Sequence, residues 1–373
     1  MNKKNVVVSA VNLNQGGTLT VAKELLSTLD DREDINVTAL VHKIDIFPSY
    51  KNIKLIEFPS IKKSWLKRLY FEFYTSSLLS KALNADIWFC AHDITANVTA
   101  KKTYVYCHNP SPFYSQLSLS DLRNDYKFWL FVHLYRFLYR INIKKNTAVF
   151  VQQQWIAKSF KKFFNINNVI VARPEKDTAD NDSDYIEFNS QRNNAVELDS
   201  SPVKLRVFYP SVPRVFKNFE VLLAAAALLE DTVYDITFVV TFDGQENSYS
   251  RSLFKKYQNL SNVEFTGYLT KLQMDDEYQR CDIVCFPSKL ETWGLPITEA
   301  KMRDIPLVLA DLEYAHETVG KYDNVCFFPP DDHFALFNII VGLANKENIL
   351  TSVDYTSSAL NGWESLVDYI LKD

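Results

Sequence analysis

The chain reads FPSKLETWGLPITEA from residue 286 to residue 300. The stretch begins at the end of an apolar, strand-like run and continues into a helical pattern. Gly294 permits close backbone approach, and Pro296 suits the first turn of a helix, where its missing N–H is not needed. A strand that passes through a short loop into a helix is the repeating unit of a parallel α/β sheet. The free N–H groups of that first turn would also favour a bound anion.

Apolar runs alternate with helical patterns in both directions from this stretch. Strands are expected at the runs 6–10, 37–42, 53–58, 86–92, 104–108, 148–152, 205–209, 236–241, 263–265, 283–286, 307–310 and 325–328. Helices are expected between them, and Asn218 is placed to cap the helix over 219–229. Continuously apolar strands separated by helices are buried on both faces. The sequence therefore predicts an α/β fold with doubly wound parallel sheets.

A change in polarity divides the chain into domains. Residues 172–201 are polar and acidic, as in a linker or insertion. They separate a first Rossmann-like domain over 1–171 from a second over 202–360. Residues 361–373 form a helix that is expected to pack back toward the first domain. Because domain interfaces are favoured ligand sites, we expect the two sheets to face a common cleft.

Composition excludes several classes of protein. The chain has 373 residues, of which 47% are hydrophobic and 23% charged, so it is not a disordered protein. The longest uncharged apolar run, Val221 to Leu229, is much shorter than the ~18 residues of a membrane span. There is no signal-peptide pattern, and five cysteines without a C-x-x-C pair suit reduced thiols, so a cytoplasmic location is expected. Neither a Walker A motif nor a G-x-G-x-x-G motif is present to support ATP or NAD binding.

The net charge of −4 conceals an asymmetry between the two halves of the chain. Residues 1–171 carry 23 Lys and Arg against 12 Asp and Glu, a net of +11, whereas residues 172–373 carry −15. Segments 62–79 and 127–145 combine basic residues with Trp, Phe and Tyr, which suits an anionic membrane surface. They could equally be ordinary helices that bury an aromatic face, but packing does not explain the positive excess. No nucleic-acid partner is expected, because no nucleic-acid-binding motif accompanies these residues.

Four charged side chains near the quoted stretch point to the chemistry. Glu291 precedes the helix and Glu299 lies within it, and carboxylates accept hydrogen bonds from vicinal hydroxyl groups. Upstream, Arg214 and Lys217 stand at another strand-to-helix junction, where two cations would neutralise a diphosphate. Both could instead be solvated surface charges. An anion site beside two hydroxyl acceptors describes a site for a nucleotide sugar.

These motifs resemble the retaining GT-B glycosyltransferases of sequence family four, the group 1 type with an E-x7-E pattern. The resemblance rests on Lys217-Asn218, on the F-x-G of residues 265–267, and on the run from Glu291 to Glu299 with its internal Gly-Leu-Pro. It implies two facing Rossmann-like domains. It also implies that Glu299 holds the nucleotide ribose, that Glu291 contacts the transferred sugar and that Lys217 binds the diphosphate.

The resemblance assigns further donor contacts to backbone groups. Amides around Trp293, Gly294 and Leu295 would meet the sugar and the phosphate. Gly16 and Gly17, after the first strand, match the glycine loop with which the first domain approaches the donor phosphate.

The sequence departs from the family pattern at one basic position. The family's arginine five residues before the lysine is replaced by Val212, and Arg214 stands three residues before Lys217, so Arg214 would approach the donor from a different angle. His108 follows a strand of the first domain, where family members often place a histidine that faces the sugar or the acceptor. It could bond a sugar hydroxyl or move a proton, or it could be a capping or core histidine.

No metal site is expected. D-x-D sequences occur at Asp180–Asp182 and Asp182–Asp184, but they lie in the polar linker with no preceding strand. Arg214 and Lys217 already supply the positive charge that a metal would bring to a diphosphate, so these aspartates are expected to be exposed to solvent.

The sequence therefore predicts a metal-independent retaining glycosyltransferase with no cofactor beyond its substrate. The donor would be a UDP- or GDP-linked hexose. The resemblance implies that the first domain holds the acceptor, so a basic first domain would suit a lipid-linked glycan, as in the synthesis of bacterial O-antigen or capsule. The enzyme would lie peripherally on the inner face of the membrane. Two alternatives stay open: another GT-B enzyme such as a sugar-nucleotide epimerase, and a non-catalytic relative that binds glycans or membranes.

Overall fold

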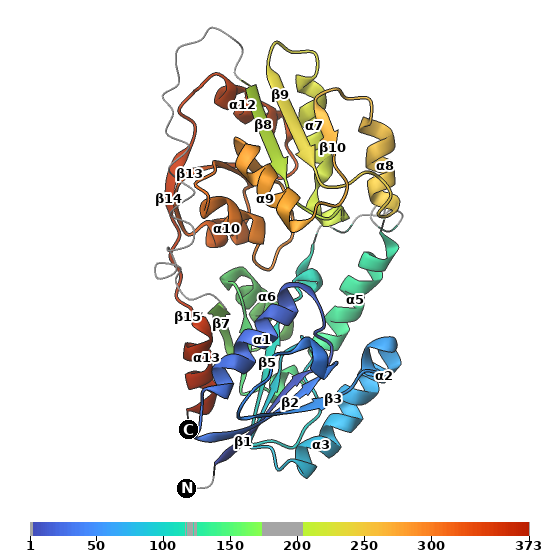
Figure 1. Cartoon of the computed structure of the whole chain (residues 1–373), viewed down its shortest axis with the longest axis vertical. Coiled ribbons are helices and arrows are strands. Elements are labelled where there is room, and N and C mark those ends of the chain that lie inside the picture. The colour runs from blue at the N-terminus through green and yellow to red at the C-terminus, as the bar shows by residue number, and fades with distance from the viewer. Residues whose placement is uncertain (1–2, 116, 118–121, 123–124, 174–203, 373) are drawn as a thin grey trace. The chain divides into compact units, whose positions relative to one another are not determined.

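The computed structural model describes residues 3–115, 117, 122, 125–173 and 204–372. Contacts between residues divide the chain into two compact units (Figure 1). The first unit comprises Met1–Phe113, Phe131–Asp180 and Ser358–Asp373, and the second comprises Tyr114–Leu130 and Asn181–Ser357. The segment Tyr114–Leu130, which the sequence analysis placed in the first domain, is thus grouped with the second unit.

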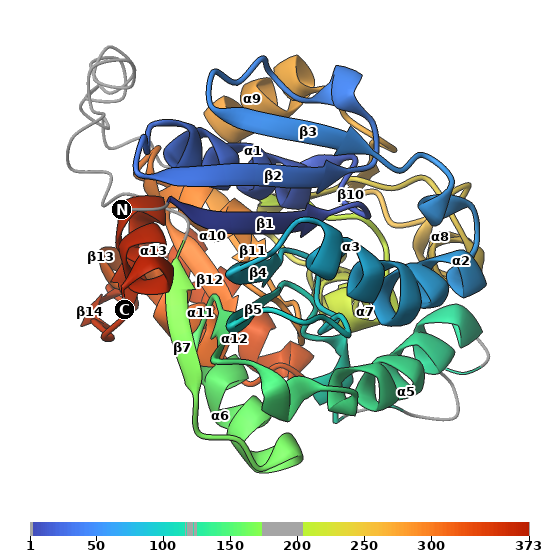
Figure 2. The ribbon, with the colours of Figure 1, turned by 90° about the horizontal axis from the view of Figure 1, so that it is seen from below.

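The first unit is built on an eight-stranded sheet in the order β3-β2-β1-β4-β5-β6-β7-β15 (Figure 2). Every pairing is parallel, and β1 aligns with β2 from Lys4 opposite Ile35 to Ala10 opposite Val41. The strands are β1 (Lys4–Ala10), β2 (Ile35–Val41), β3 (Ile53–Glu57), β4 (Ile87–Cys90), β5 (Lys102–Cys107), β6 (Ala148–Val151), β7 (Val169–Arg173) and β15 (Leu360–Asn361).

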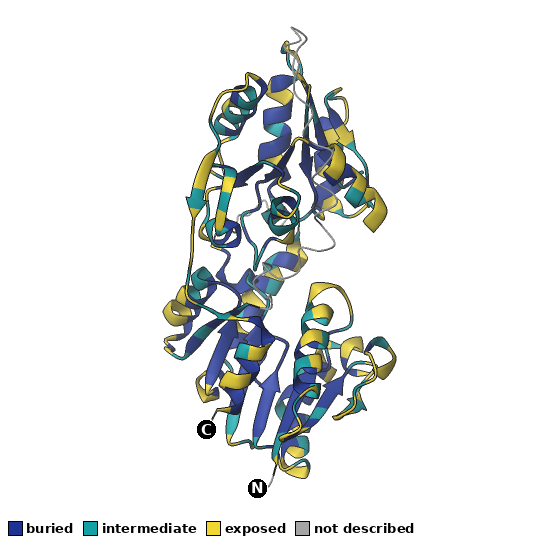
Figure 3. Cartoon of the chain, turned by 60° about the vertical axis from the view of Figure 1, so that its left-hand side comes forward, coloured by how far each residue is buried: buried dark blue, intermediate teal, exposed yellow. Residues whose placement is uncertain are grey.

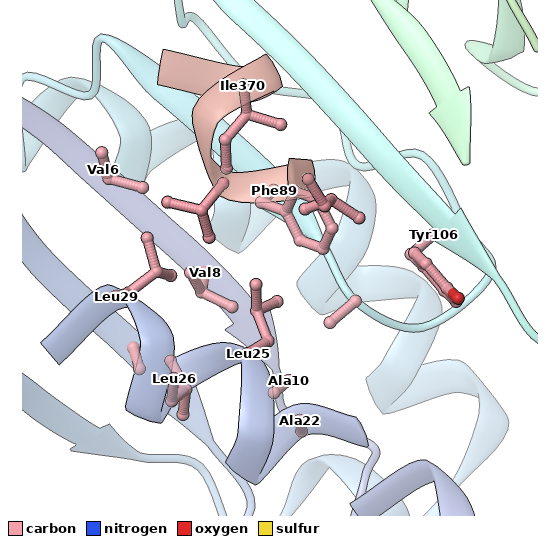
Figure 4. Close-up of a cluster of buried hydrophobic side chains, with 14 of the residues drawn as sticks. Val6, Val8, Ala10, Ala22, Leu25, Leu26, Leu29, Phe89, Tyr106 and Ile370 are labelled. Atoms are coloured by element: carbon pink, nitrogen blue, oxygen red, sulfur yellow. The ribbon is translucent and has the colours of Figure 1, made fainter. Parts of the chain in front are cut away.

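Helices cover both faces of this sheet because successive residues of a strand point to opposite sides. Val6, Val8 and Ala10 of β1 pack with α1 and the C-terminal helix α13 (Figure 4). Val7, between them, packs with side chains of the opposite layer, including Phe71. The helices are α1 (Gly16–Asp30), α2 (Trp65–Tyr70), α3 (Ser76–Ala82), α5 (Tyr126–Arg140), α6 (Gln154–Phe164) and α13 (Gly362–Leu371), and a π-helical turn, Phe71–Thr75, joins α2 to α3. The residues of α5 as far as Leu130 are grouped with the second unit.

The second unit repeats the same winding in a seven-stranded sheet of order β10-β9-β8-β11-β12-β13-β14. All pairings are parallel except that of β13 with β14. Its strands are β8 (Lys204–Tyr209), β9 (Asp235–Val240), β10 (Val263–Phe265), β11 (Ile283–Phe286), β12 (Leu307–Ala310), β13 (Lys321–Phe328) and β14 (Thr351–Asp354). Its helices are α7 (Phe219–Leu229), α8 (Ser248–Tyr257), α9 (Lys271–Arg280), α10 (Leu295–Lys301), α11 (Glu313–Val319) and α12 (His333–Ala344).

The predicted class of fold is confirmed, since each unit has a doubly wound, mostly parallel sheet. Figure 3 shows the central strands of both sheets as buried and the outer positions of the helices as exposed. Among the described residues, no helix has the length and apolar character needed to cross a membrane.

Helix α7 begins differently from the prediction. Asn218 stands at its N-terminal boundary, but the side chain makes no capping hydrogen bond. The amide instead donates to the carbonyls of Pro287 and Pro330, at 3.1 and 2.7 Å. The prediction of a side-chain cap was wrong because a capping residue needs an extended backbone, whereas Asn218 has φ +57° in the left-handed region that asparagine tolerates.

Candidate active site

The second sheet reverses its direction of winding between β8 and β11, which lie side by side. In open α/β sheets, ligands bind outside the carboxyl ends of the strands at such a switch point. The segment after β8 carries Lys217, and the segment after β11 carries Glu291. The fold therefore brings two predicted residues, 74 positions apart in the chain, to one edge of the sheet.

Hydrogen bonds join the two segments at this edge. The backbone N–H of Lys289 donates to the carbonyl of Phe216 at 2.7 Å. The buried hydroxyl of Tyr209 donates to the carbonyl of Lys217 at 2.7 Å, and that of Tyr314 donates to the carbonyl of Ser288 at 2.6 Å. Because the backbones on either side are fixed in this way, the Lys217 and Glu291 side chains start from defined positions.

Lys217 and Glu291 form an ion pair, with Nζ 2.5 Å from Oε1. The side chains are 14% and 13% exposed, so the pair is largely shielded from water but still reachable from solvent. Shielding strengthens the interaction of such a pair with any charge placed beside it. The site thus offers a cation for phosphate oxygens and a carboxylate for hydroxyl groups.

The loop that follows Glu291 depends on a glycine. Gly294 has φ +86°, and a Cβ built there would lie 3.3 Å from Ile297 Cδ1. A larger residue would therefore be strained in its backbone and crowded against the helix. Trp293 is held by its indole N–H, which donates to the Thr298 hydroxyl at 3.0 Å, and Leu295, exposed, begins α10. These contacts hold the loop at the place where the sequence analysis predicted donor contacts.

Glu299 lies on α10 and is oriented by a tyrosine that the sequence analysis missed. The Tyr278 hydroxyl donates to Glu299 Oε2 at 2.6 Å. Burial, together with the Glu299 carboxylate, raises the pKa of Tyr278, so the hydroxyl remains a hydrogen-bond donor. Arg303 stacks over the Tyr278 ring, 4.7 Å from its centre, and donates to the Glu299 carbonyl at 2.9 Å. Tyr278 belongs to α9, and no sequence motif connects it with α10.

Arg214 is paired with a residue outside the predicted second domain. Its Nε lies 2.9 Å from Asp125 Oδ2, and its guanidinium lies 5.8 Å from the centre of the Phe128 ring. Asp125 and Phe128 belong to the segment Tyr114–Leu130, which is part of the second unit. The sequence analysis could not find this pair because it assigned that segment to the other domain.

The two glycines and the histidine that were predicted as site residues of the first domain lie in the first unit. Gly16 has φ +65° and starts α1 after β1, and a Cβ at Gly16 or Gly17 would meet nothing within 4 Å. His108 follows β5, and its Nε2 donates to the carbonyl of Ala91 at 3.1 Å. Burial lowers the pKa of His108, which favours the neutral ring. Asp93 fixes this loop, because its Oδ1 accepts the N–H of His108 at 2.7 Å.

The switch point of the first sheet, between β1 and β4, is occupied by a buried polar cluster. Ser9 Oγ lies 3.1 Å from His92 Nε2, and Glu72 Oε1 lies 3.4 Å from His92 Nδ1. Arg68 donates to the His92 carbonyl at 3.0 Å and to the Tyr135 hydroxyl at 3.1 Å. Burial raises the pKa of Glu72 to about 8 and lowers that of His92 to about 3. The cluster is sealed from solvent, and we expect it to stabilise the first unit.

The described residues contain no group of three or more His, Cys, Asp or Glu side chains able to hold a metal ion. The D-x-D sequences at Asp180–Asp182 and Asp182–Asp184 lie outside the described residues.

The chain thus has two doubly wound units, with a shielded ion pair at the switch point of the second unit and a second glutamate on the helix that follows. Residues 194–350 match the model of the family Glycosyl transferases group 1. The second unit therefore carries a group 1 glycosyltransferase domain, and the resemblance stated from the sequence motifs is confirmed. A search of curated protein sequences found no significant match to this chain.

Solved structures of glycosyltransferases share the fold over nearly the whole chain. Sucrose-phosphate synthase from Thermosynechococcus elongatus is 13% identical, with a TM-score of 0.60 over 92% of this chain and 90% of that one. The lipopolysaccharide outer core galactosyltransferase WaaB is 14% identical, with a TM-score of 0.60 over the same shares. HepE from Anabaena, in complex with UDP-glucose, is 15% identical, with a TM-score of 0.54 over 98% of this chain and 94% of that one.

Proposed function

We propose that the chain is a retaining hexosyltransferase that moves a sugar from a nucleoside-diphosphate donor to a glycan without a metal ion. The observation that carries the proposal is the shielded ion pair of Lys217 and Glu291 at the switch point of the second sheet. A diphosphate that leaves during transfer gains negative charge, which Lys217 would stabilise in place of a metal. The loop over Trp293, Gly294 and Leu295 supports the same role, with backbone amides close to the donor.

In this proposal each glutamate binds a different part of the donor. Glu299, oriented by Tyr278, accepts hydrogen bonds from the nucleotide ribose. Glu291 exchanges its contact with Lys217 for hydroxyl groups of the sugar when the diphosphate reaches the lysine. Arg214, which lies against Asp125, contributes positive charge for the diphosphate of the donor. Gly16 and Gly17 leave room for a phosphate to approach the backbone.

The proposed reaction breaks the bond between the anomeric carbon and the diphosphate oxygen, with an oxocarbenium-like transition state. The acceptor hydroxyl forms the new bond on the same face, and its proton passes to the departing phosphate oxygen. This same-face course is taken by analogy with the family. His108, whose neutral ring is favoured because burial lowers its pKa, would hydrogen-bond the sugar or the acceptor.

We further propose a UDP- or GDP-hexose as donor, a lipid-linked saccharide as acceptor, and a peripheral position on the inner face of the membrane. WaaB, which is a lipopolysaccharide galactosyltransferase, and HepE, which binds UDP-glucose, support a sugar nucleotide and a surface glycan. Bacterial O-antigen or capsule synthesis fits this combination. The net charge of +11 in residues 1–171 supports an anionic surface as the place of action.

Thermal unfolding of the full chain with UDP, GDP and their hexose derivatives tests the donor. A ligand that binds only the folded protein raises the unfolding temperature, and the shift grows with the ratio of its free concentration to its Kd. We expect one nucleotide class to raise it, and Glu299→Ala to abolish most of that shift. If neither class raises it, the proposal fails. Product analysis with and without a glycan acceptor then separates transfer from epimerisation of the donor.

A further inference from the structure

Helices α2 and α3, with the π-helical turn between them, expose a continuous apolar stripe. Leu66 is 78% exposed, Tyr70 is 60%, and Tyr74 and Leu78 are each 53% exposed. The four residues are spaced four apart, so they follow one another along one side of the helical segment. Soluble helices normally place polar residues on such a face.

Helix α5 lies beside this segment, and α6 lies beside α5. The Trp65 ring contacts the Tyr135 ring of α5, with 5.8 Å between centroids, and Figures 1 and 2 both show α2 beside α5. Arg136 of α5 lies over the Phe163 ring of α6 at 5.7 Å. Each helix exposes apolar side chains there. We call the whole set the apolar–basic surface: Leu66, Tyr70, Tyr74, Leu78, Leu134, Phe137 and Phe163.

The exposed charges along these helical segments are all positive. Lysines are exposed along the first helical segment at 62, 63, 67 and 81, and along the others basic residues are exposed at 140, 144, 145, 158, 161 and 162. The single carboxyl between residues 61 and 84, Glu72, is fully buried. Residues 126–164 contain no Asp or Glu at all. The described surface of these helices thus combines apolar side chains with cations and lacks exposed anions.

We propose that the apolar–basic surface docks on an anionic lipid bilayer, with the helices lying along the interface. Leu and Phe side chains would enter the boundary of the acyl chains, Tyr rings would remain at the level of the headgroups, and the lysines would contact acidic headgroups. A second copy of the chain fits less well, because a symmetric contact would bring two cationic rims together. The proposal deepens the peripheral location in the proposed function by assigning it to named residues.

Vesicle flotation of the full chain, without any sugar nucleotide, tests the surface apart from transfer. We expect binding to phosphatidylcholine vesicles that contain phosphatidylglycerol to be at least roughly tenfold tighter than binding to pure phosphatidylcholine, because of the headgroup charge. The double variant Leu66→Asp, Phe137→Asp should lose at least about tenfold in affinity for the anionic vesicles. Leu272→Asp is the matched control, since Leu272 is 82% exposed on a helix of the second unit, and it should bind as the unchanged protein does.

A triple variant, Lys62→Gln, Lys63→Gln, Lys67→Gln, tests the electrostatic part. It should bind anionic vesicles more weakly and lose affinity less steeply as salt shortens the screening distance below ~10 Å. Unchanged binding in the double variant, or equal binding to both kinds of vesicle, overturns the proposal. The proposal is also overturned if the unchanged protein binds no vesicles but forms a concentration-dependent dimer that is lost in the double variant. Thermal unfolding with the nucleotide confirms that each variant folds and keeps its donor site, so failure here is distinct from failure of the proposed function.

Discussion

The two sheets have the same winding but use their switch points differently. In each, the first strand of the unit lies beside the fourth, β1 beside β4 and β8 beside β11. In the second unit this place holds Lys217 and Glu291, which are shielded but reachable. In the first unit it holds Ser9, His92 and Glu72, all fully buried.

The difference teaches that the position in the fold alone does not make a site. Polar residues gather at both switch points because the loops after the central strands meet there. Those of the first unit are buried beside Arg68, which donates to the His92 carbonyl and to the Tyr135 hydroxyl. In the second unit, Lys217 and Glu291 are reachable from solvent, so a ligand could replace either residue as the partner of the other. Substitutions at the two places should therefore affect different quantities.

The largest expected effect is on transfer. Lys217→Ala and Glu291→Ala should each lower the rate of sugar transfer about 100-fold or more, because a developing charge loses its preorganised partner. The unfolding temperature should change little, since the pair is still reached by water. The measurement is the initial rate of product formation with a glycan acceptor.

A matched control for this prediction lies on β8, the strand that precedes Lys217 in the chain. Lys204 at the amino end of β8 pairs with Asp235 at 3.0 Å and is 85% exposed. Lys204→Ala should transfer sugar at the normal rate. Near-normal turnover in the Lys217 variant, or an equal loss of turnover in the Lys204 variant, would show that the switch point of the second sheet is not the site of transfer.

The second effect concerns the buried cluster and appears in stability. Arg68→Ala removes two charge-assisted hydrogen bonds, those to the His92 carbonyl and the Tyr135 hydroxyl. Bonds of this kind contribute about 1.5 kcal/mol each or more, so the free energy of unfolding should fall by about 3 kcal/mol. Urea denaturation measures the loss. A variant as stable as the unchanged protein would show that the cluster does not hold the first unit together.

The third effect is a pH dependence of stability that originates in Glu72. Burial raises its pKa from 4.5 to about 8, so between those values the folded chain binds more protons than the unfolded chain, and stability falls as pH rises. His92, with a pKa lowered from 6.5 to about 3, gives the opposite slope, but only below pH 6.5. Between pH 6.5 and 8 the contribution of Glu72 remains whereas that of His92 does not, so the Glu72 contribution to stability should decline there.

The variant Glu72→Gln isolates this contribution. It removes the titrating group but keeps the size of the side chain, so its stability should be level between pH 6.5 and 8. Urea denaturation at both pH values, for both proteins, gives the comparison. Parallel declines in the two proteins would assign the slope to other groups.

Much of the fold could be predicted, and the exceptions have physical causes. The central strands are continuously apolar, and this pattern located β8, β11 and β12. Strand β14, with the sequence TSVD, is an edge strand with no fully buried residue, so it carries no apolar signal. The motif residues Lys217 and Glu291 could be placed together because strand-to-helix loops converge. Asp125 and Tyr278 could not be predicted, since their contacts depend on how distant helices pack.

The smallest effect tests one of those missed residues. Tyr278→Phe keeps the ring beneath Arg303 but removes the hydroxyl that donates to Glu299 at 2.6 Å. One lost hydrogen bond to a positioning group corresponds to about 1 kcal/mol, so nucleotide affinity should fall about fivefold, less than in Glu299→Ala. Calorimetric titration with the free nucleoside diphosphate measures the affinity of both variants. If Tyr278 acts only by orienting Glu299, the hydroxyl has no role in binding once Glu299 is removed. The double variant Tyr278→Phe, Glu299→Ala should then bind the nucleotide no more weakly than Glu299→Ala alone. Additive losses of affinity would mean that Tyr278 contacts the nucleotide itself. In that case α9, which no sequence motif connects with α10, would be part of the site at the switch point of the second sheet.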